Sequence, residues 1–189
     1  MLTYKSTSLI ISCLHAVVTS RLCEYTIYTE ELLDIEKFGS PMTPLQYKIF
    51  IFIFGYLFYD TILLMLHRKD AVLTLHHLIG IATILSVFMT SRSGPDVIFC
   101  TWLGIFPNFS FTVRYYFKQY SQSPNSRIAK INDRLLSFQL IARFVVGFFL
   151  MFVIVIGNSI FFLKFLYIGM FLVNLKYLGR IAIDGIRNR

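Results

Sequence analysis

Six apolar stretches, each about 20 residues long, dominate the sequence, and this length matches a helix that crosses a bilayer. They cover residues 6–23, 46–66, 71–91, 97–117, 135–156 and 159–181. In lipid, backbone groups must be satisfied within the protein, so that only helices and closed barrels cross a membrane. The sequence therefore predicts an all-α membrane protein with about six transmembrane helices in one bundle around a polar cavity.

The composition agrees with this fold class and excludes others. Of the 189 residues, 56% are hydrophobic and only 15% are charged, whereas a soluble domain carries about a quarter charged residues. The net charge of +8 does not indicate nucleic acid, because the basic residues lie between the apolar stretches rather than in a patch. Residues 1–189 are expected to form a single transmembrane domain. Three scattered cysteines predict neither a disulfide framework nor a metal site.

The charges of the connecting loops predict the orientation. Residues 24–36 contain five acidic side chains, whereas the connections around Arg68 and Arg127 are basic. Basic loops of multi-pass proteins face the cytosol. We therefore predict that both termini and these two arginines are cytosolic and that Glu31 lies across the membrane. Met1 to Lys5 are not followed by a signal-peptide cleavage pattern.

The segment Gly55 to His77 places three ionisable side chains inside apolar helices. Asp60 precedes a four-residue polar break at residues 67–70, and His76 and His77 follow it. So short a break forces the two helices into an antiparallel hairpin, with Asp60 and the histidines each about 9 Å from the turn. Ionisable groups within a bilayer are costly and usually functional.

Other polar side chains are expected at a similar depth, in the cytosolic half of the membrane. The resulting candidate cavity or lipid-binding residues are His15, Asp60, His76, His77, Arg143 and Asn174. Pro107 is expected to kink the fourth stretch near the same level, because proline cannot complete a helical backbone. The sequence thus predicts one polar site, or one buried network, that is reached from the cytosol.

Two interpretations of this site remain open. A histidine beside a carboxylate can act as a general base, in which case His76, His77 and Asp60 are the catalytic candidates. Alternatively, a histidine only satisfies Asp60, with Arg143 neutralising the same carboxylate or holding a lipid phosphate. A metal would need a third histidine or carboxylate, and we expect neither a metal nor a cofactor.

Several short motifs resemble those of a known family. They are Ser12-Cys13-Leu14-His15-Ala16, Gly55-Tyr56-x-x-x-Asp60, Leu75-His76-His77, Arg114, Phe138-x-x-x-x-Arg143 and Asn174-x-x-Tyr177-x-x-x-Ile181. Their order and spacing resemble the TLC family, the membrane domain shared by ceramide synthases, TRAM proteins and CLN-type proteins. The resemblance covers nearly the whole chain. It implies a six-helix bundle around a lipid-accessible cavity lined by His15, Asp60, His76 and His77, in the endoplasmic reticulum or a related membrane.

The sequence also departs from the pattern of ceramide synthases. Those enzymes follow the histidine pair with an acidic motif of the form HDxSD, whereas residues 95–106 here read PDVIFCTWLGIF. Tyr177 stands where a tryptophan is common, and many relatives have a further span before the first one here. These departures favour the branch of the family that does not synthesise ceramide.

Three functions remain in view after these departures. The favoured one is a non-catalytic protein that binds lipid and acts in membrane lipid homeostasis. The second is an acyl-CoA-dependent N-acyltransferase, with acyl-CoA as co-substrate, and the third is a cargo receptor or translocation helper. Membrane lipids are the expected partners, nucleic acid is not, and homo- and hetero-oligomers are both compatible with the sequence.

Overall fold

A computed structural model describes residues 4–68, 70–120 and 127–187 of the chain, and within these residues it contains helices and connections but no β-strand. The α-helices are α1 (Tyr4–Thr29), α2 (Pro44–Leu63), α3 (Ala71–Thr90), α4 (Gly94–Ile105), α5 (Asn108–Tyr120), α6 (Arg127–Ile156) and α7 (Phe161–Arg187). A 3-10 turn, η1 (Ile35–Lys37), and a π-helical segment, η2 (Leu64–Arg68), complete the elements. The all-α prediction is confirmed.

Four helical segments of the described chain are long and apolar enough to cross a membrane by length and composition. They are Pro44–Leu66, Ala71–Thr90, Gly94–Arg114 and Arg127–Ile156. The predicted stretches 6–23 and 159–181 fall on α1 and α7. The protein is therefore a multi-pass membrane bundle, and the predicted number of about six spans fits its helices when α4 and α5 are taken as one broken span.

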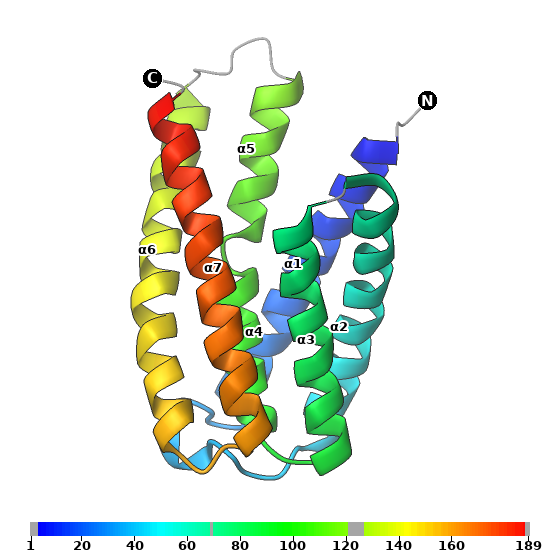
Figure 1. Cartoon of the computed structure of the whole chain (residues 1–189), viewed down its shortest axis with the longest axis vertical. Coiled ribbons are helices and arrows are strands. Elements are labelled where there is room, and N and C mark those ends of the chain that lie inside the picture. Colours follow the sequence, from blue (N-terminus) through cyan, green and yellow to red (C-terminus); the bar gives the residue numbers. More distant parts are fainter. Residues whose placement is uncertain (1–3, 69, 121–126, 188–189) are drawn as a thin grey trace.

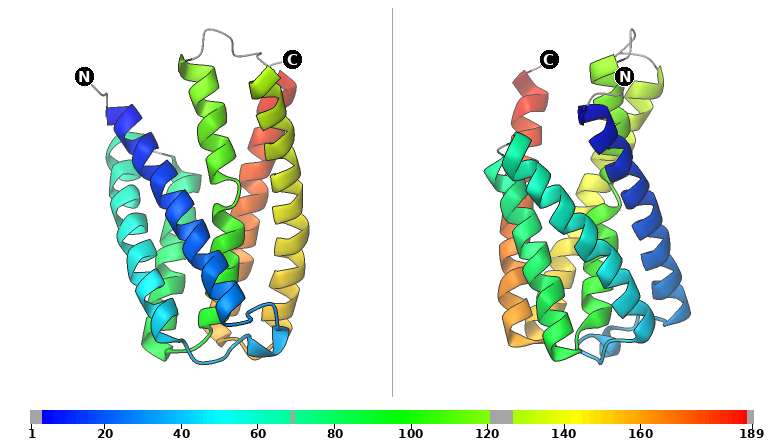
Figure 2. Two further views of the ribbon diagram at one scale, coloured as in Figure 1. Left: turned by 180° about the vertical axis from the view of Figure 1, so that it is seen from behind. Right: turned by 90° about the vertical axis from the view of Figure 1, so that its right-hand side faces the viewer.

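The helices stand side by side, and both termini lie at one end of the bundle (Figures 1 and 2). We call this the terminal end; it also holds η2, between α2 and α3. We call the opposite end the loop end; it holds residues 30–43, 91–93 and 157–160. The helix α4 lies inside the loop half, where it contacts α1, α2, α3 and α6. In the terminal half α5 contacts α1 and α6 instead.

The change from α4 to α5 occurs at a proline. The helix α4 ends at Ile105, α5 begins at Asn108, and Pro107 lies fully buried between them. Proline has no N–H to donate, and its ring collides with the preceding turn, so a straight helix cannot continue through it. The predicted kink is confirmed, and it is sharp enough to separate two helices.

The observed helices are longer than several of the predicted stretches. The predicted segment 6–23 lies within a helix that runs from Tyr4 to Thr29, and the segment 135–156 belongs to a helix that begins at Arg127. The polar side chains in the last turns of α1 do not end it, because Thr26 and Thr29 donate to backbone carbonyls one turn earlier. The predicted stretches thus lie within these helices but do not give their full extent.

Local capping explains where α2 and α3, the two helices of the predicted hairpin, begin. Thr43 caps α2 through a capping box with Gln46, and Pro44 occupies the first turn. Asp70 caps α3 by accepting from the N–H groups of Val72 and Leu73. The acid of the polar break therefore starts the second helix of the hairpin.

The distribution of apolar side chains is that of a membrane bundle. Phe50, Ile98 and Leu163 are fully buried and belong to one core at the loop half of the bundle. Many large apolar side chains are exposed, such as Phe148, which is 54% exposed, and Phe165, which is 58% exposed. With no water to avoid in a bilayer, an apolar outer surface is the expected one.

Candidate functional site

The two helices of the α2–α3 hairpin bring an acid and a histidine together. Asp60 lies in the last turn of α2, and His77 lies in the second turn of α3. His77 Nδ1 is 3.6 Å from Asp60 Oδ2, and both side chains are buried. The depth predicted for these residues from the short break is therefore correct. The neighbour that the structure places beside Asp60 is His77.

His15 enters the same region from α1. Its ring stacks on Tyr56 of α2, with the ring centroids 3.6 Å apart, and His15 Nε2 forms a hydrogen bond with Thr19 Oγ1 at 3.1 Å. Tyr56 in turn donates its hydroxyl to Ser12 Oγ at 2.9 Å. His15 is buried, and its position is fixed by an aromatic face and a hydroxyl rather than by an acid.

Arg143 and Asn174, the remaining two predicted site residues apart from His76, lie on the other side of the bundle. Arg143 Nη2 of α6 donates to Asn174 Oδ1 of α7 at 3.0 Å. The same nitrogen lies above the end of α4, because a Cβ atom added at Gly104 would be 3.9 Å from it. The sequence predicted that Arg143 neutralises Asp60 or holds a phosphate, and the hydrogen bond to Asn174 is a third role that it did not predict.

The two sides of the set are joined by the histidine pair. The rings of His76 and His77, neighbours on α3, have their centroids 5.8 Å apart, and α3 packs against α7, which carries Asn174. The six predicted residues, from five helices, therefore gather in the terminal half of the bundle, where α4 has ended. We call this set the polar cluster; its members are His15, Asp60, His76, His77, Arg143 and Asn174.

The polar cluster combines acid–base and hydrogen-bonding capacity in an apolar bundle. An imidazole beside a carboxylate can accept a proton, and a guanidinium can bind a phosphate or carboxylate. Within residues 4–68, 70–120 and 127–187 no group of three or more His, Cys, Asp or Glu side chains could hold a metal ion. The side chains of the cluster could transfer a proton or recognise a polar headgroup.

Sequence reasoning missed part of this region. It assigned no role to Ser12, Thr19 or Tyr56, although Ser12 and Tyr56 lie in the motifs quoted above. The spacing of His15 and Thr19, four residues apart on one helix face, is a signal that could have indicated their contact. The stacking of His15 on Tyr56 depends on how α1 and α2 rotate against each other, and no local pattern gives that rotation.

A second buried polar group lies at the loop end. Asp96, in the first turn of α4, is fully buried and accepts a hydrogen bond from the backbone N–H of Gly39 at 2.8 Å and another from Ser159 Oγ. Ser93 Oγ accepts from the N–H of Ile160 nearby. We call these contacts the Asp96 network. The predicted stretch 97–117 begins one residue after this acid, whereas α4 begins at Gly94 and includes it.

Glu30 organises a neighbouring contact at the loop end. Its carboxylate accepts from Thr43 Oγ1 at 2.7 Å and from Gln46 Nε2, and its backbone carbonyl accepts from Lys37 Nζ. Gln46 is fully buried against Gly94, where a Cβ atom would collide with its side-chain oxygen. These contacts join the ends of α1 and α2 to the start of α4.

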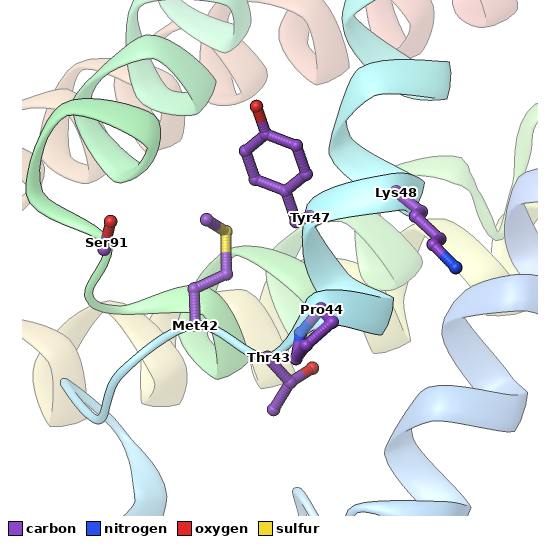
Figure 3. A pocket seen from close by; sticks show the side chains of 6 residues that line it. All are labelled: Met42, Thr43, Pro44, Tyr47, Lys48 and Ser91. Carbon is purple, nitrogen blue, oxygen red and sulfur yellow. The ribbon is translucent and has the colours of Figure 1, made fainter.

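Two hollows of the structure also lie at the loop end. One, of about 380 Å³, is lined by Met42, Thr43, Pro44, Tyr47, Lys48 and Ser91 (Figure 3). Another, of about 310 Å³, is lined by residues that include Phe38, Phe152 and Asn158. The predicted cavity at the polar cluster stays a prediction.

Comparison with known proteins leaves the chain without an assigned relative. No family model, no curated protein and no solved structure matches it.

Proposed function

We propose that this chain is an endomembrane protein of the TLC type that binds membrane lipid at the polar cluster and acts in membrane lipid homeostasis. The observation that supports this most is the gathering of six polar side chains from five helices in an otherwise apolar bundle. Such groups are expensive within a bilayer and mark functional sites by default. A lipid headgroup is the polar ligand that a membrane supplies in abundance.

The contacts within the cluster support a binding role. Asp60 beside His77 offers an acceptor and a donor, and Arg143 lies on the opposite side with Asn174. Arg143, His76 and Asn174 are each partly exposed, whereas Asp60 and His77 are buried. A polar headgroup would thus meet the Arg143 side first, with the acid–histidine pair behind it.

A second candidate is an acyl-CoA-dependent N-acyltransferase, which the contact between His77 and Asp60 favours. In this reaction the amine nitrogen attacks the thioester carbonyl, a C–N bond forms, the C–S bond breaks and the thiolate leaves. His77 would take the proton of the amine, and Asp60 would stabilise the resulting imidazolium. His76 is the alternative base.

Two observations weigh against the enzyme. Residues 97–105, which follow the histidine pair, contain no carboxylate in the place of the acidic motif of ceramide synthases. Asp96, which directly precedes that stretch, lies at the loop end, where its carboxylate accepts hydrogen bonds from Gly39 and Ser159. We therefore keep lipid binding as the proposed function.

The location follows from the same reasoning. We place the protein in the endoplasmic reticulum or a related endomembrane, as the resemblance implies, with both termini cytosolic, as the basic loops indicate. In this orientation the terminal end faces the cytosol, and a lipid reaches the polar cluster from the cytosolic leaflet.

The test separates binding from catalysis. Wild type and the variants His76→Ala and His77→Ala are purified, their co-purified lipid is quantified by mass spectrometry, and each is offered a long-chain base with labelled acyl-CoA. We expect no acyl transfer by the wild type, and loss of co-purified lipid in at least one histidine variant.

A matched control removes the effect of lower stability alone. Ser159→Ala weakens the Asp96 network at the loop end without touching the polar cluster, and it should keep the lipid. Strong acylation by the wild type that disappears in a well-folded His77→Ala variant would replace the proposal by the enzyme. Equal loss of lipid in Ser159→Ala would show that lipid retention reports stability and not the cluster.

A further inference from the structure

The outward face of α6 changes character abruptly along its length. Near the start of the helix, Arg127, Lys130 and Arg134 are exposed and lie within about 60° of one another, because successive residues turn by 100°. Ala129, Asn132 and Leu136 are the buried residues of the same turns and lie on the opposite face. The three cations therefore point away from the bundle. We call them the basic strip.

Below the basic strip the same face is apolar as far as the end of the helix. The exposed side chains on it are Phe138, Ile141, Val145, Phe148, Phe152 and Ile156. From Phe138 to Ile156 the helix rises by about 27 Å, which matches the hydrocarbon core of a bilayer, about 30 Å thick. The boundary between hydrocarbon and headgroups is thus expected between Arg134 and Phe138.

This boundary sets the height of the basic strip. Arg134 lies one helical turn, about 6 Å, beyond Phe138, and Lys130 lies one turn further. The headgroup layer on each side of a bilayer is about 5–8 Å thick. Arg134 is therefore expected at the level of the lipid phosphates, and the long side chains of Lys130 and Arg127, whose backbones lie about 12 and 16 Å beyond Phe138, would reach back toward the phosphates.

The nearest acid in the sequence, Asp133, does not neutralise the positive charge of the basic strip. Asp133 pairs with Arg114 of α5, with its Oδ1 at 3.2 Å from Arg114 Nε. The first turn of α6 contains no acidic residue, although the start of a helix is its positive end. Among the residues whose side chains the structure describes, which do not include Asp184, no carboxylate lies within ion-pair distance of Arg127, Lys130 or Arg134.

From this geometry we propose that the basic strip is a binding site for the headgroups of anionic phospholipids. The partner is a lipid surface rather than a soluble acidic molecule, because exposed Leu135 and Phe138 flank Arg134 and would lie in the lipid interface with it. A soluble acidic protein or an RNA would leave these apolar side chains without a counterpart. The proposal is independent of the function proposed for the polar cluster.

The test uses the whole protein, purified in a neutral detergent at low salt. Short-chain phosphatidylserine and phosphatidylcholine are titrated separately, and the shift of the thermal unfolding midpoint is recorded for each lipid. We expect saturable stabilisation by phosphatidylserine and little by phosphatidylcholine. Each cation near an anionic lipid surface contributes about 1 kcal/mol, so Lys130→Gln should raise the half-saturating concentration about five-fold.

Matched variants establish that the response depends on charge and position. Lys130→Arg keeps the charge and should bind phosphatidylserine as the wild type does. Lys48→Gln removes an exposed cation at the loop end and should leave the titration unchanged. The triple variant Arg127→Gln, Lys130→Gln, Arg134→Gln should lose the phosphatidylserine response, and the single variants report on the site if the triple variant does not fold.

Several results would overturn the proposal. One is a phosphatidylserine response of Lys130→Gln equal to that of the wild type or of Lys48→Gln. Another is an equal midpoint shift with soluble glycerophosphoserine, which would identify a site for free phosphate. A third is binding of a polyglutamate peptide, lost in Lys130→Gln, by a protein whose phosphatidylserine response stays intact, which would identify an acidic protein as the partner.

Discussion

His77 Nδ1 lies 3.6 Å from Asp60 Oδ2, across the two helices of the α2–α3 hairpin, and each side chain is less than a tenth exposed. This separation is longer than a hydrogen bond, so the contact between these two atoms is electrostatic. A buried carboxylate is costly unless a partner compensates it. The hairpin supplies that partner from the adjoining helix, only 17 positions along the chain.

The first prediction concerns the coupling of this pair. Removing one partner of a buried pair costs about 3–5 kcal/mol, because the other is left uncompensated, whereas removing both costs less than the sum. We expect Asp60→Ala and His77→Ala each to lower the free energy of unfolding in detergent. The double variant should then be more stable than additivity predicts, by about 1–3 kcal/mol.

The control for this cycle is a pair at opposite ends of the bundle. Asp60→Ala combined with Ser159→Ala should be additive within about 0.5 kcal/mol, because the two residues share no partner. Additivity of Asp60→Ala with His77→Ala would contradict the pairing. In that case Asp60→Ala with Arg143→Leu becomes the cycle to measure.

The second prediction concerns Asp96. Its carboxylate accepts from the Gly39 N–H and from Ser159, so Asp96→Ala leaves a buried backbone donor and a buried hydroxyl unsatisfied. We expect a loss of about 3–5 kcal/mol in the free energy of unfolding, from two groups at about 1–3 kcal/mol each. Asp96→Asn keeps one acceptor for Gly39 and should cost less, and Ser159→Ala should cost least. The expected loss of unfolding free energy in detergent is largest for Asp96→Ala, smaller for Asp96→Asn and smallest for Ser159→Ala. Any other order would contradict the network.

The third prediction compares two glycines. Gly39 has φ +79°, and a Cβ atom there would lie 2.6 Å from the backbone oxygen of Asn158. Gly39→Ala should therefore cost at least about 2 kcal/mol, from a strained backbone and a collision with main chain that cannot turn away. Gly55, in the middle of α2, has nothing within 4 Å of its Cβ position. Gly55→Ala should be neutral or stabilising by up to about 1 kcal/mol, since alanine favours a helix. Equal midpoints of thermal unfolding for the two variants would refute the close approach at Gly39.

The fourth prediction concerns orientation. Glu31→Cys places a thiol at the loop end, and Arg127→Cys places one at the terminal end. A membrane-impermeant maleimide should label Arg127→Cys from the cytosolic side and Glu31→Cys only when the lumenal side is opened. The three native cysteines provide the background, and Cys23 among them is fully buried. Labelling with the two positions exchanged would invert the proposed topology.

The sequence predicted the parts of the fold that depend on local spacing. A connection this short between two apolar stretches allows one geometry, an antiparallel hairpin, and this brings Asp60 to the level of His77, although the structure continues the first helix as η2 through Arg68. Depth along a helix follows from residue count, and it correctly grouped Arg143 and Asn174. The break at Pro107 follows from the chemistry of one residue.

The rest depends on contacts between distant segments. The burial of Asp96 requires Gly39, 57 positions earlier, and Ser159, 63 positions later. A local signal for a helix start was present, since Pro95 and Asp96 suit a first turn, but it does not show which loops cover that turn. The hydrogen bond from Arg143 to Asn174 depends likewise on the rotation of α6 against α7, which the spacing of residues in the sequence does not determine.

The Asp96 network makes the two ends of the bundle mechanically unequal. It fastens the connection before α2 to the starts of α4 and α7, so any widening of the bundle pivots about the loop end. A helix of 30 residues such as α6 is a lever about 45 Å long. A tilt of about 5° at its base moves the far end by about 4 Å, and the level of Asp60, 16 residues beyond Pro44, by about 2 Å. A tilt of whole helices about the loop end would therefore change the spacing of side chains most at the terminal end and least at the loop end.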